Sequence, residues 1–93
     1  MNLNHKQQEL VDFLFDKVKE KFPNVELCNL TTSPDDPEHI WINVITDNGE
    51  DEVYAIMDYA VGYIADIHID YGYRISVMPS NREWADTYLR RAG

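Results

Sequence analysis

The sequence predicts a single α+β domain, a two-layer sandwich in which two long helices cover a three-stranded sheet. Two long segments carry apolar residues at helical spacing, and short apolar runs between them are bounded by turn residues. The segments follow one another in the order α-β-β-α-β-α, which favours helices packed on a sheet. The chain has 93 residues, so residues 1–93 are expected to form one domain.

The first helix is expected between Asn4 and Pro23. Asn4 can cap its N-terminus, and Gln7 stands three residues later, as in a capping box. Pro23 ends the helix because a proline ring cannot continue the hydrogen-bond pattern. The apolar stripe recurs at helical spacing and consists of Leu10, Phe13, Leu14, Val18 and Phe22.

Two strands are expected next, over residues 25–30 and 39–45. The segment 31–37 between them is rich in Ser, Thr, Pro and Asp, which predicts a loop. The second strand carries apolar groups on both faces, so we expect it to lie at the centre of the sheet. Cys28 falls inside the first apolar run and is expected to be a buried structural thiol.

A long helix is expected after the turn at residues 47–49, with Gly72 at its end. It would cross over between the second and third strands, so those two strands can run parallel through a right-handed connection. Its buried stripe is expected to contain Val53, Ile56, Met57, Ala60, Val61 and Ile64, and to continue through Ile67 or His68 to Tyr71.

The third strand is expected over residues 74–78, because Pro79 should stop it. Residues 80–83 read Ser-Asn-Arg-Glu, a capping box for a final helix. Trp84 and Tyr88 are one turn apart in that helix and are expected to pack it onto the body of the domain.

The charge distribution excludes some partners. The formal net charge is −9, and residues 22–73 contain eleven Asp or Glu and no Lys or Arg. Such a surface repels phosphate backbones, so direct nucleic-acid binding is not expected. It favours a basic protein partner, and a second copy of the chain, giving a homodimer, is the other partner considered.

The expected location is cytoplasmic. The first residues are polar and form no signal peptide, and no apolar run approaches the ~20 residues of a membrane span. A single cysteine allows no internal disulfide, which suits a reducing compartment.

One face of the long helix is a candidate interaction face. Three aspartates fall on the side away from the apolar stripe, and tyrosines lie on or near the same side. Aromatic residues beside acids are more typical of an interface than acids alone. The candidate face consists of Asp58, Tyr59, Tyr63, Asp66 and Asp70.

No catalytic residue, metal ligand or cofactor is predicted. Residues 50–52 are all acidic and invite a metal site with Asp47, but carboxylates in a first helical turn also complement the helix dipole. Asp66, His68 and Asp70 would share a face only in a strand, whereas the apolar period predicts a helix. Cys28 has no catalytic context.

The order of elements supports a family resemblance. The two strands, the Ser-Pro-Asp-Asp-Pro loop, the long helix and the segment Arg74–Ser80 followed by Glu83-Trp84 resemble the minimal nucleotidyltransferase domain of the polymerase-β type. That family places Gly-Ser after the first strand and Asp-x-Asp at the second. Here residues 28–31 read Cys-Asn-Leu-Thr, and His39 and Trp41 replace the aspartates, so the resemblance implies a catalytically inactive copy.

The sequence therefore favours a non-catalytic, protein-binding or regulatory module over an enzyme. Two alternatives stay open. One is a diverged metal-dependent enzyme such as a minimal nucleotidyltransferase, and the other is an acidic inhibitor that mimics nucleic acid.

Overall fold

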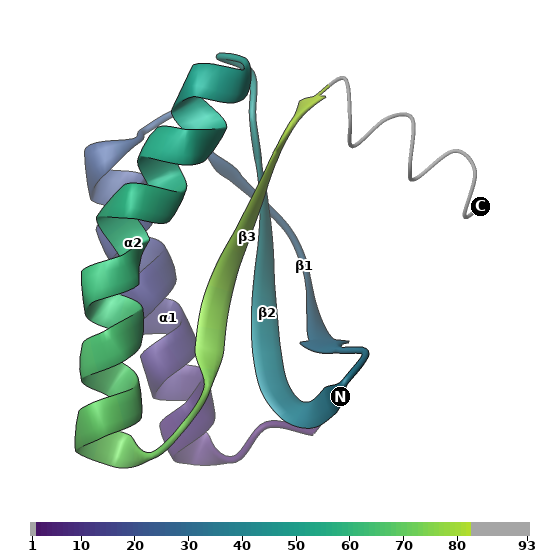
Figure 1. Cartoon of the computed structure of the whole chain (residues 1–93), viewed down its shortest axis with the longest axis vertical. Coiled ribbons are helices and arrows are strands. Elements are labelled where there is room, and N and C mark those ends of the chain that lie inside the picture. The colour runs from purple at the N-terminus through teal and green to yellow at the C-terminus, as the bar shows by residue number, and fades with distance from the viewer. Residues whose placement is uncertain (1, 83–93) are drawn as a thin grey trace.

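A computed structural model describes residues 2–82 of the chain. Both helices lie on one face of a three-stranded sheet, which is the predicted two-layer α+β sandwich (Figure 1). The predicted final helix falls almost entirely outside the described residues. The elements are α1 (His5–Lys21), β1 (Glu26–Ser33), β2 (Asp36–Thr46), α2 (Glu50–Tyr71) and β3 (Ile75–Asn81).

Helix α1 begins and ends where the sequence predicts. The side chain of Asn4 accepts a hydrogen bond from the Gln7 backbone at 2.7 Å, and the Gln7 side chain accepts one from the Asn4 backbone at 2.9 Å. Both halves of the capping box are therefore formed, which satisfies two of the backbone N–H groups at the helix start.

The sheet has the order β1-β2-β3, so β2 is the central strand, as predicted. Strand β1 pairs antiparallel to β2, and β3 pairs parallel to it. Helix α2 supplies the crossover that a parallel pair requires. Ile40 and Ile42 of β2 stand beside Ile75 and Val77 of β3, and all four are buried.

The prediction of a loop over residues 31–37 is wrong. Strands β1 and β2 extend into this segment, and only Pro34 and Asp35 remain as the turn. A two-residue connection is enough for a β-hairpin, and the β-branched Thr31 and Thr32 suit a strand. The Ser33 hydroxyl accepts a hydrogen bond from the Asp35 backbone at 3.3 Å, within the turn.

Cys28 is exposed, so the prediction of a buried thiol is also wrong. The pairing of β1 with β2 shifts register between Leu27 and Asn29, which marks a bulge at Cys28. A bulge leaves its extra residue out of the ladder, and among residues 2–82 no second strand pairs with β1. Apolar composition alone did not reveal either feature.

Strand β3 continues through Pro79 to Asn81, contrary to the prediction that Pro79 stops it. The backbone of Ile40 donates to the Arg74 carbonyl at 2.9 Å, so even-numbered residues of β3 direct their backbone groups toward β2. Pro79 is odd-numbered, and its missing N–H falls on the side of β3 opposite β2, where no strand pairs with it in the part of the chain that the structure describes. The proline therefore interrupts no hydrogen bond of the ladder.

The core lies between the helices and the sheet. Gly72 ends α2 as predicted, in the left-handed region at φ +76°. Three members of the predicted α2 stripe, Met57, Val61 and Tyr71, are instead exposed, and Phe13 of the α1 stripe is nearly half exposed. The largest fully buried side chains include Leu14, Val18, Val25, Ile40, Ile42, Val44, Ile56 and Ile75.

Within residues 2–82, neither helix combines the length and apolar character needed to traverse a lipid bilayer.

A candidate interaction groove between the two helices

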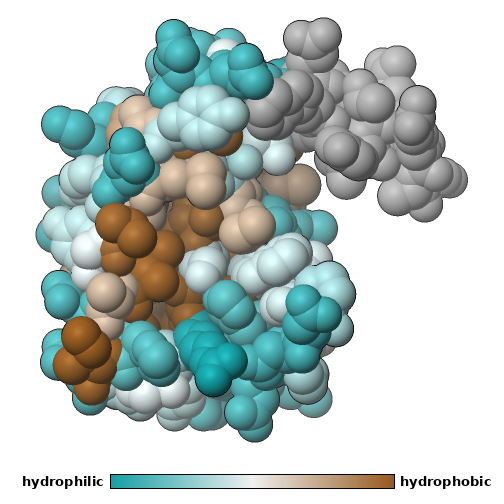
Figure 2. Space-filling view, viewed as in Figure 1, coloured by the Kyte–Doolittle hydropathy of each residue, from teal (hydrophilic) through white to brown (hydrophobic). Residues whose placement is uncertain are grey.

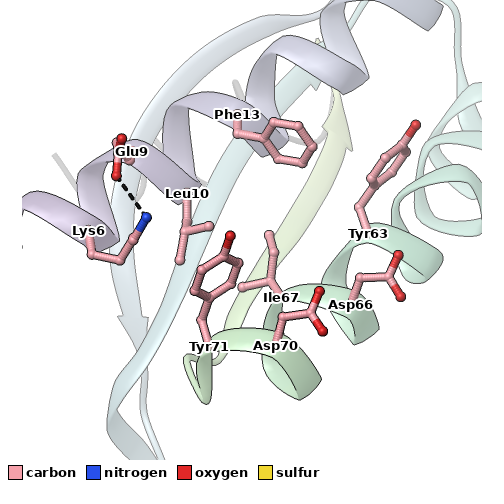
Figure 3. Close-up of a pocket in the computed structure, with 9 residues that line it drawn as sticks. All are labelled: Lys6, Glu9, Leu10, Phe13, Tyr63, Asp66, Ile67, Asp70 and Tyr71. Carbon is pink, nitrogen blue, oxygen red and sulfur yellow. Dashed lines mark ion pairs between the residues drawn. The ribbon is translucent and has the colours of Figure 1, made fainter.

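A groove of about 390 Å³ runs between α1 and α2 on the outer side of the helical layer (Figure 3). One wall comes from the first half of α1 and the other from the second half of α2. We call it the helix groove. It is lined by Lys6, Glu9, Leu10, Phe13, Tyr63, Asp66, Ile67, Asp70 and Tyr71.

The floor of the helix groove is apolar. Leu10 and Ile67 are buried and belong to the hydrophobic core, so they close the groove from below. They are buried because each helix must turn one stripe toward the sheet, and these two residues lie on the facing edges of those stripes. A ligand in the groove would therefore contact hydrocarbon beneath it.

Aromatic rings continue along the seam between the helices. The ring centroids of Phe13 and Tyr63 are 5.9 Å apart, in an edge-to-face arrangement. Tyr63 is 5.6 Å from Tyr59, and Tyr59 is 5.8 Å from Phe22. These distances suit favourable aromatic pairs, so the four rings form one row that joins α1 to α2.

The rim of the groove carries three carboxylates and one ammonium. Lys6 pairs with Glu9 at 3.1 Å, and its Nζ atom lies 5.0 Å from the centroid of the Tyr71 ring. Asp66 and Asp70 stand on the opposite wall and point outward from α2 (Figure 3). Neither aspartate forms an ion pair within residues 2–82, so the lining has an excess of negative charge.

The ion pair and the aromatic row change the acidities of their members. Hydrogen bonding and charge attraction from Glu9 raise the pKa of Lys6, and Lys6 lowers the pKa of Glu9 in the same way. Hydrogen bonding with the Tyr63 phenol raises the pKa of Tyr59 above its ordinary value, and partial burial adds to that effect.

The structure brings four of the five predicted interaction residues to the seam between the helices. Tyr63, Asp66 and Asp70 line the groove, and Tyr59 packs against Tyr63 at one end of it. Asp58 does not join them, because eight residues at 100° each place it about 80° around α2 from Asp66. Asp58 is exposed outside the groove.

Sequence reasoning missed the α1 wall and Tyr71. Helical spacing shows which residues of α2 share a face, and it does not show which face of α1 stands opposite. The only signal for this wall was that Phe13 lies at the edge of the α1 stripe and Lys6 lies one turn from Leu10. How the two helices are rotated against each other depends on their packing on the sheet.

A second surface lies on the other side of α2, and we call it the α2 flank. Apolar surface extends along α2 and into the seam beside β3 (Figure 2). Its residues recur at intervals of three, four and eight, so they share one side of the helix. The α2 flank consists of the exposed side chains Tyr54, Met57, Val61 and Ile69.

A polar pair lies on the sheet face turned away from the helices. The Nε2 atom of His39 is 2.7 Å from the Ser76 hydroxyl, and the His39 ring stands edge-on to Trp41. A hydroxyl beside an imidazole is the first part of a nucleophile–base arrangement, which also needs a group that orients the base. Among residues 2–82, no carboxylate is hydrogen-bonded to His39.

Asp47, in the acidic turn before α2, forms an ion pair with Arg82. Asp47 accepts a hydrogen bond from Arg82 at 2.8 Å, and the same guanidinium donates to Glu26 at 2.8 Å. In the part of the chain that the structure describes, no three His, Cys, Asp or Glu side chains gather as a metal site would require.

The segment 66–70 is helical, as predicted, so Asp66 and Asp70 share a side of α2 and His68 does not.

The comparisons with known proteins add no relative, since no family model, curated protein or solved structure matches the chain. The resemblance to the nucleotidyltransferase family stays a prediction. His39 and Trp41, the residues at its two aspartate positions, both face away from the helices.

Proposed function

We propose that this chain is a non-catalytic protein-binding module, and that the helix groove holds a basic segment of its partner. The observation that carries the proposal is the meeting of aromatic rings with Asp66 and Asp70, which form no ion pair within residues 2–82, around one apolar floor. Interfaces are enriched in aromatic residues, and aromatic faces beside carboxylates attract cations.

The charge of the whole chain supports a basic partner. Both walls carry carboxylates, and the segment from Phe22 to Tyr73 supplies no lysine or arginine to neutralise them. A partner with the opposite charge would be drawn toward this surface and would bind faster at low salt.

The same charge argues against a second copy as the occupant of the groove. Each copy has a formal charge of −9, and an isologous contact at the groove would bring together two copies of the same negatively charged patch. Like charges opposed across an interface weaken it. A basic partner relieves this repulsion, and a second copy increases it.

The test uses two designed peptides of equal length with the same aliphatic and aromatic residues. One peptide carries lysine at every charged position, and the other carries glutamate. We expect only the lysine peptide to perturb the NMR signals of residues lining the groove. Replacing Asp66 and Asp70 with asparagine should weaken its binding by up to about fivefold per residue, because each removes one exposed charge pair.

The matched control is Asp58→Asn, which removes an equal charge from the same helix outside the groove. It should change the affinity much less than Asp66→Asn or Asp70→Asn. Equal effects of all three variants would mean that only the overall charge matters. That result, or equal binding of both peptides, would overturn the proposed site.

A further inference from the structure

We propose that the helix groove recognises the ammonium group of a lysine side chain, and that Lys6 occupies this ammonium position in the free protein. The inference rests on the proposed function, because it names the chemical group of the basic partner and the internal group that competes with it.

The geometry of Lys6 carries the first step. Its Nζ atom lies 5.0 Å from the centroid of the Tyr71 ring and 3.1 Å from a carboxylate oxygen of Glu9. An ammonium within about 6 Å of a ring centroid is attracted by the negative face of the ring. The groove thus already binds one alkylammonium between an aromatic face and a carboxylate, and that group belongs to the chain itself.

The position of Lys6 makes it exchangeable. Its side chain is 47% exposed, and it reaches the ring of Tyr71 from the opposite wall of the groove (Figure 3). An exposed lysine side chain has several rotamers of similar energy and loses entropy when it is held in one. Lys6 can therefore leave the Tyr71 ring without disturbing the core.

The remaining lining suits an incoming lysine better than a guanidinium. The floor made by Leu10 and Ile67 is hydrocarbon, which matches the four methylene groups of a lysine stem. Arginine recognition uses two parallel hydrogen bonds to one carboxylate, and lysine acts as a compact point charge. The carboxylate beside the ammonium position is that of Glu9, and Lys6 meets it through one Nζ–O contact of 3.1 Å, as suits a point charge.

When an external ammonium group displaces Lys6, one positive charge replaces another in the groove. An incoming ammonium replaces that of Lys6 at Glu9 and Tyr71, so part of its binding energy is spent on displacing Lys6. Removing Lys6 leaves Glu9 without its partner and the Tyr71 ring uncovered. The groove should therefore bind external ammonium groups more tightly when Lys6 is absent.

The test is an NMR titration with n-butylammonium, which reproduces the end of a lysine side chain. Its neutral control is n-butanol, which has the same carbon chain and no charge. The proteins are the wild type, Lys6→Met, and Lys21→Met, which removes an equal charge from α1 away from the groove. The signals followed are those of Tyr63, Ile67 and Tyr71.

We expect Lys6→Met to bind n-butylammonium about two- to fivefold more tightly than the wild type, the range of an exposed cation–π contact. Lys21→Met should resemble the wild type, and Tyr71→Leu should lose most of the binding. Lys6→Gln, a polar replacement, should act like Lys6→Met. If n-butanol binds as well as n-butylammonium, or if Lys6→Met and Lys21→Met behave alike, the inference is wrong.

The two proposals fail separately. A lysine peptide that binds the groove with equal affinity in wild type and Lys6→Met would overturn the role of Lys6 and leave the proposed function standing. Groove binding of n-butylammonium, without any binding of the lysine peptide, would support the ammonium site and overturn the protein-binding function.

Discussion

The pKa of Glu9 depends on its ion pair with Lys6 at the rim of the helix groove. Lys6 holds the pKa of Glu9 below its ordinary value of 4.5. A carboxylate whose pKa is lowered on folding stabilises the protein above its unfolded pKa, and that stabilisation is lost as the pH falls through the folded pKa. The contribution of the pair is therefore present at neutral pH and disappears in acid.

We predict that an NMR titration of the Glu9 carboxyl gives a pKa below 4.5 in the wild type and close to 4.5 in Lys6→Met. The advantage in urea stability of the wild type over Glu9→Gln should shrink as the pH falls below 4.5. Lys21→Met should leave the Glu9 titration unchanged. A Glu9 pKa that does not respond to Lys6→Met would mean that the pair does not persist in solution.

Three residues of the α2 wall, Tyr63, Asp66 and Asp70, were predictable, since their spacing alone places them on one side of the helix. Cys28 was not predictable, because its exposure follows from a bulge. A shift of register depends on how β1 meets β2, and the residues of β1 alone do not specify it.

Helix α2 is apolar over a wider arc than the sheet can cover. Ile67 is 3% exposed and Ile69 is 79% exposed, although they are two residues apart in the same helix. About 200° separate their side chains, so one faces the core and the other faces solvent. The burial of an apolar residue of α2 therefore depends on its angle around the helix axis.

This pair of isoleucines gives a matched test of the packing. Ile67→Ala should lower the free energy of unfolding by roughly 2–5 kcal/mol, because it opens a cavity in the core. Ile69→Ala should change it by less than about 0.5 kcal/mol, since it removes only exposed surface. Urea unfolding measures both. A comparable loss in the two variants would mean that Ile69 is covered in solution, by the chain itself or by another molecule.

The assignment of Met57 and Val61 to the core failed for the same reason. The sequence pattern correctly placed Val53, Ile56 and Ala60 against the sheet, and it extended the stripe to two neighbours that the three-stranded sheet does not reach. The width of a sheet is set by the number of its strands, which local periodicity does not report.

Arg82 connects the end of β3 to the start of β1 and to the turn before α2. The guanidinium of Arg82, after the end of β3, donates to Glu26 at the start of β1 and to Asp47 in the turn between β2 and α2. These two partners raise the pKa of Arg82, Asp47 more than Glu26. These charge-assisted hydrogen bonds stabilise the end of the sheet at which Glu26, Asp47 and Arg82 lie.

We predict that Arg82→Gln lowers the urea midpoint, by less than Ile67→Ala does, because the charges are exposed to solvent and screened. The difference in urea midpoint between Arg82→Gln and the wild type should decrease as the sodium chloride concentration is raised. In a double-mutant cycle, Arg82→Gln and Asp47→Asn should be less than additive, because both remove the same contact. Strict additivity at low salt would show that Arg82 and Asp47 do not interact.

The position of Pro79 limits how the molecule can associate with others. No strand formed by residues 2–82 pairs with the outer border of β3, where Ile75 and Val77 supply backbone donors and Pro79 then interrupts the series. A foreign strand added there would lose its ladder after these two positions, so template-driven fibril growth from this border is obstructed. Any assembly of this protein that involves the β3 side must therefore be held mainly by its side chains.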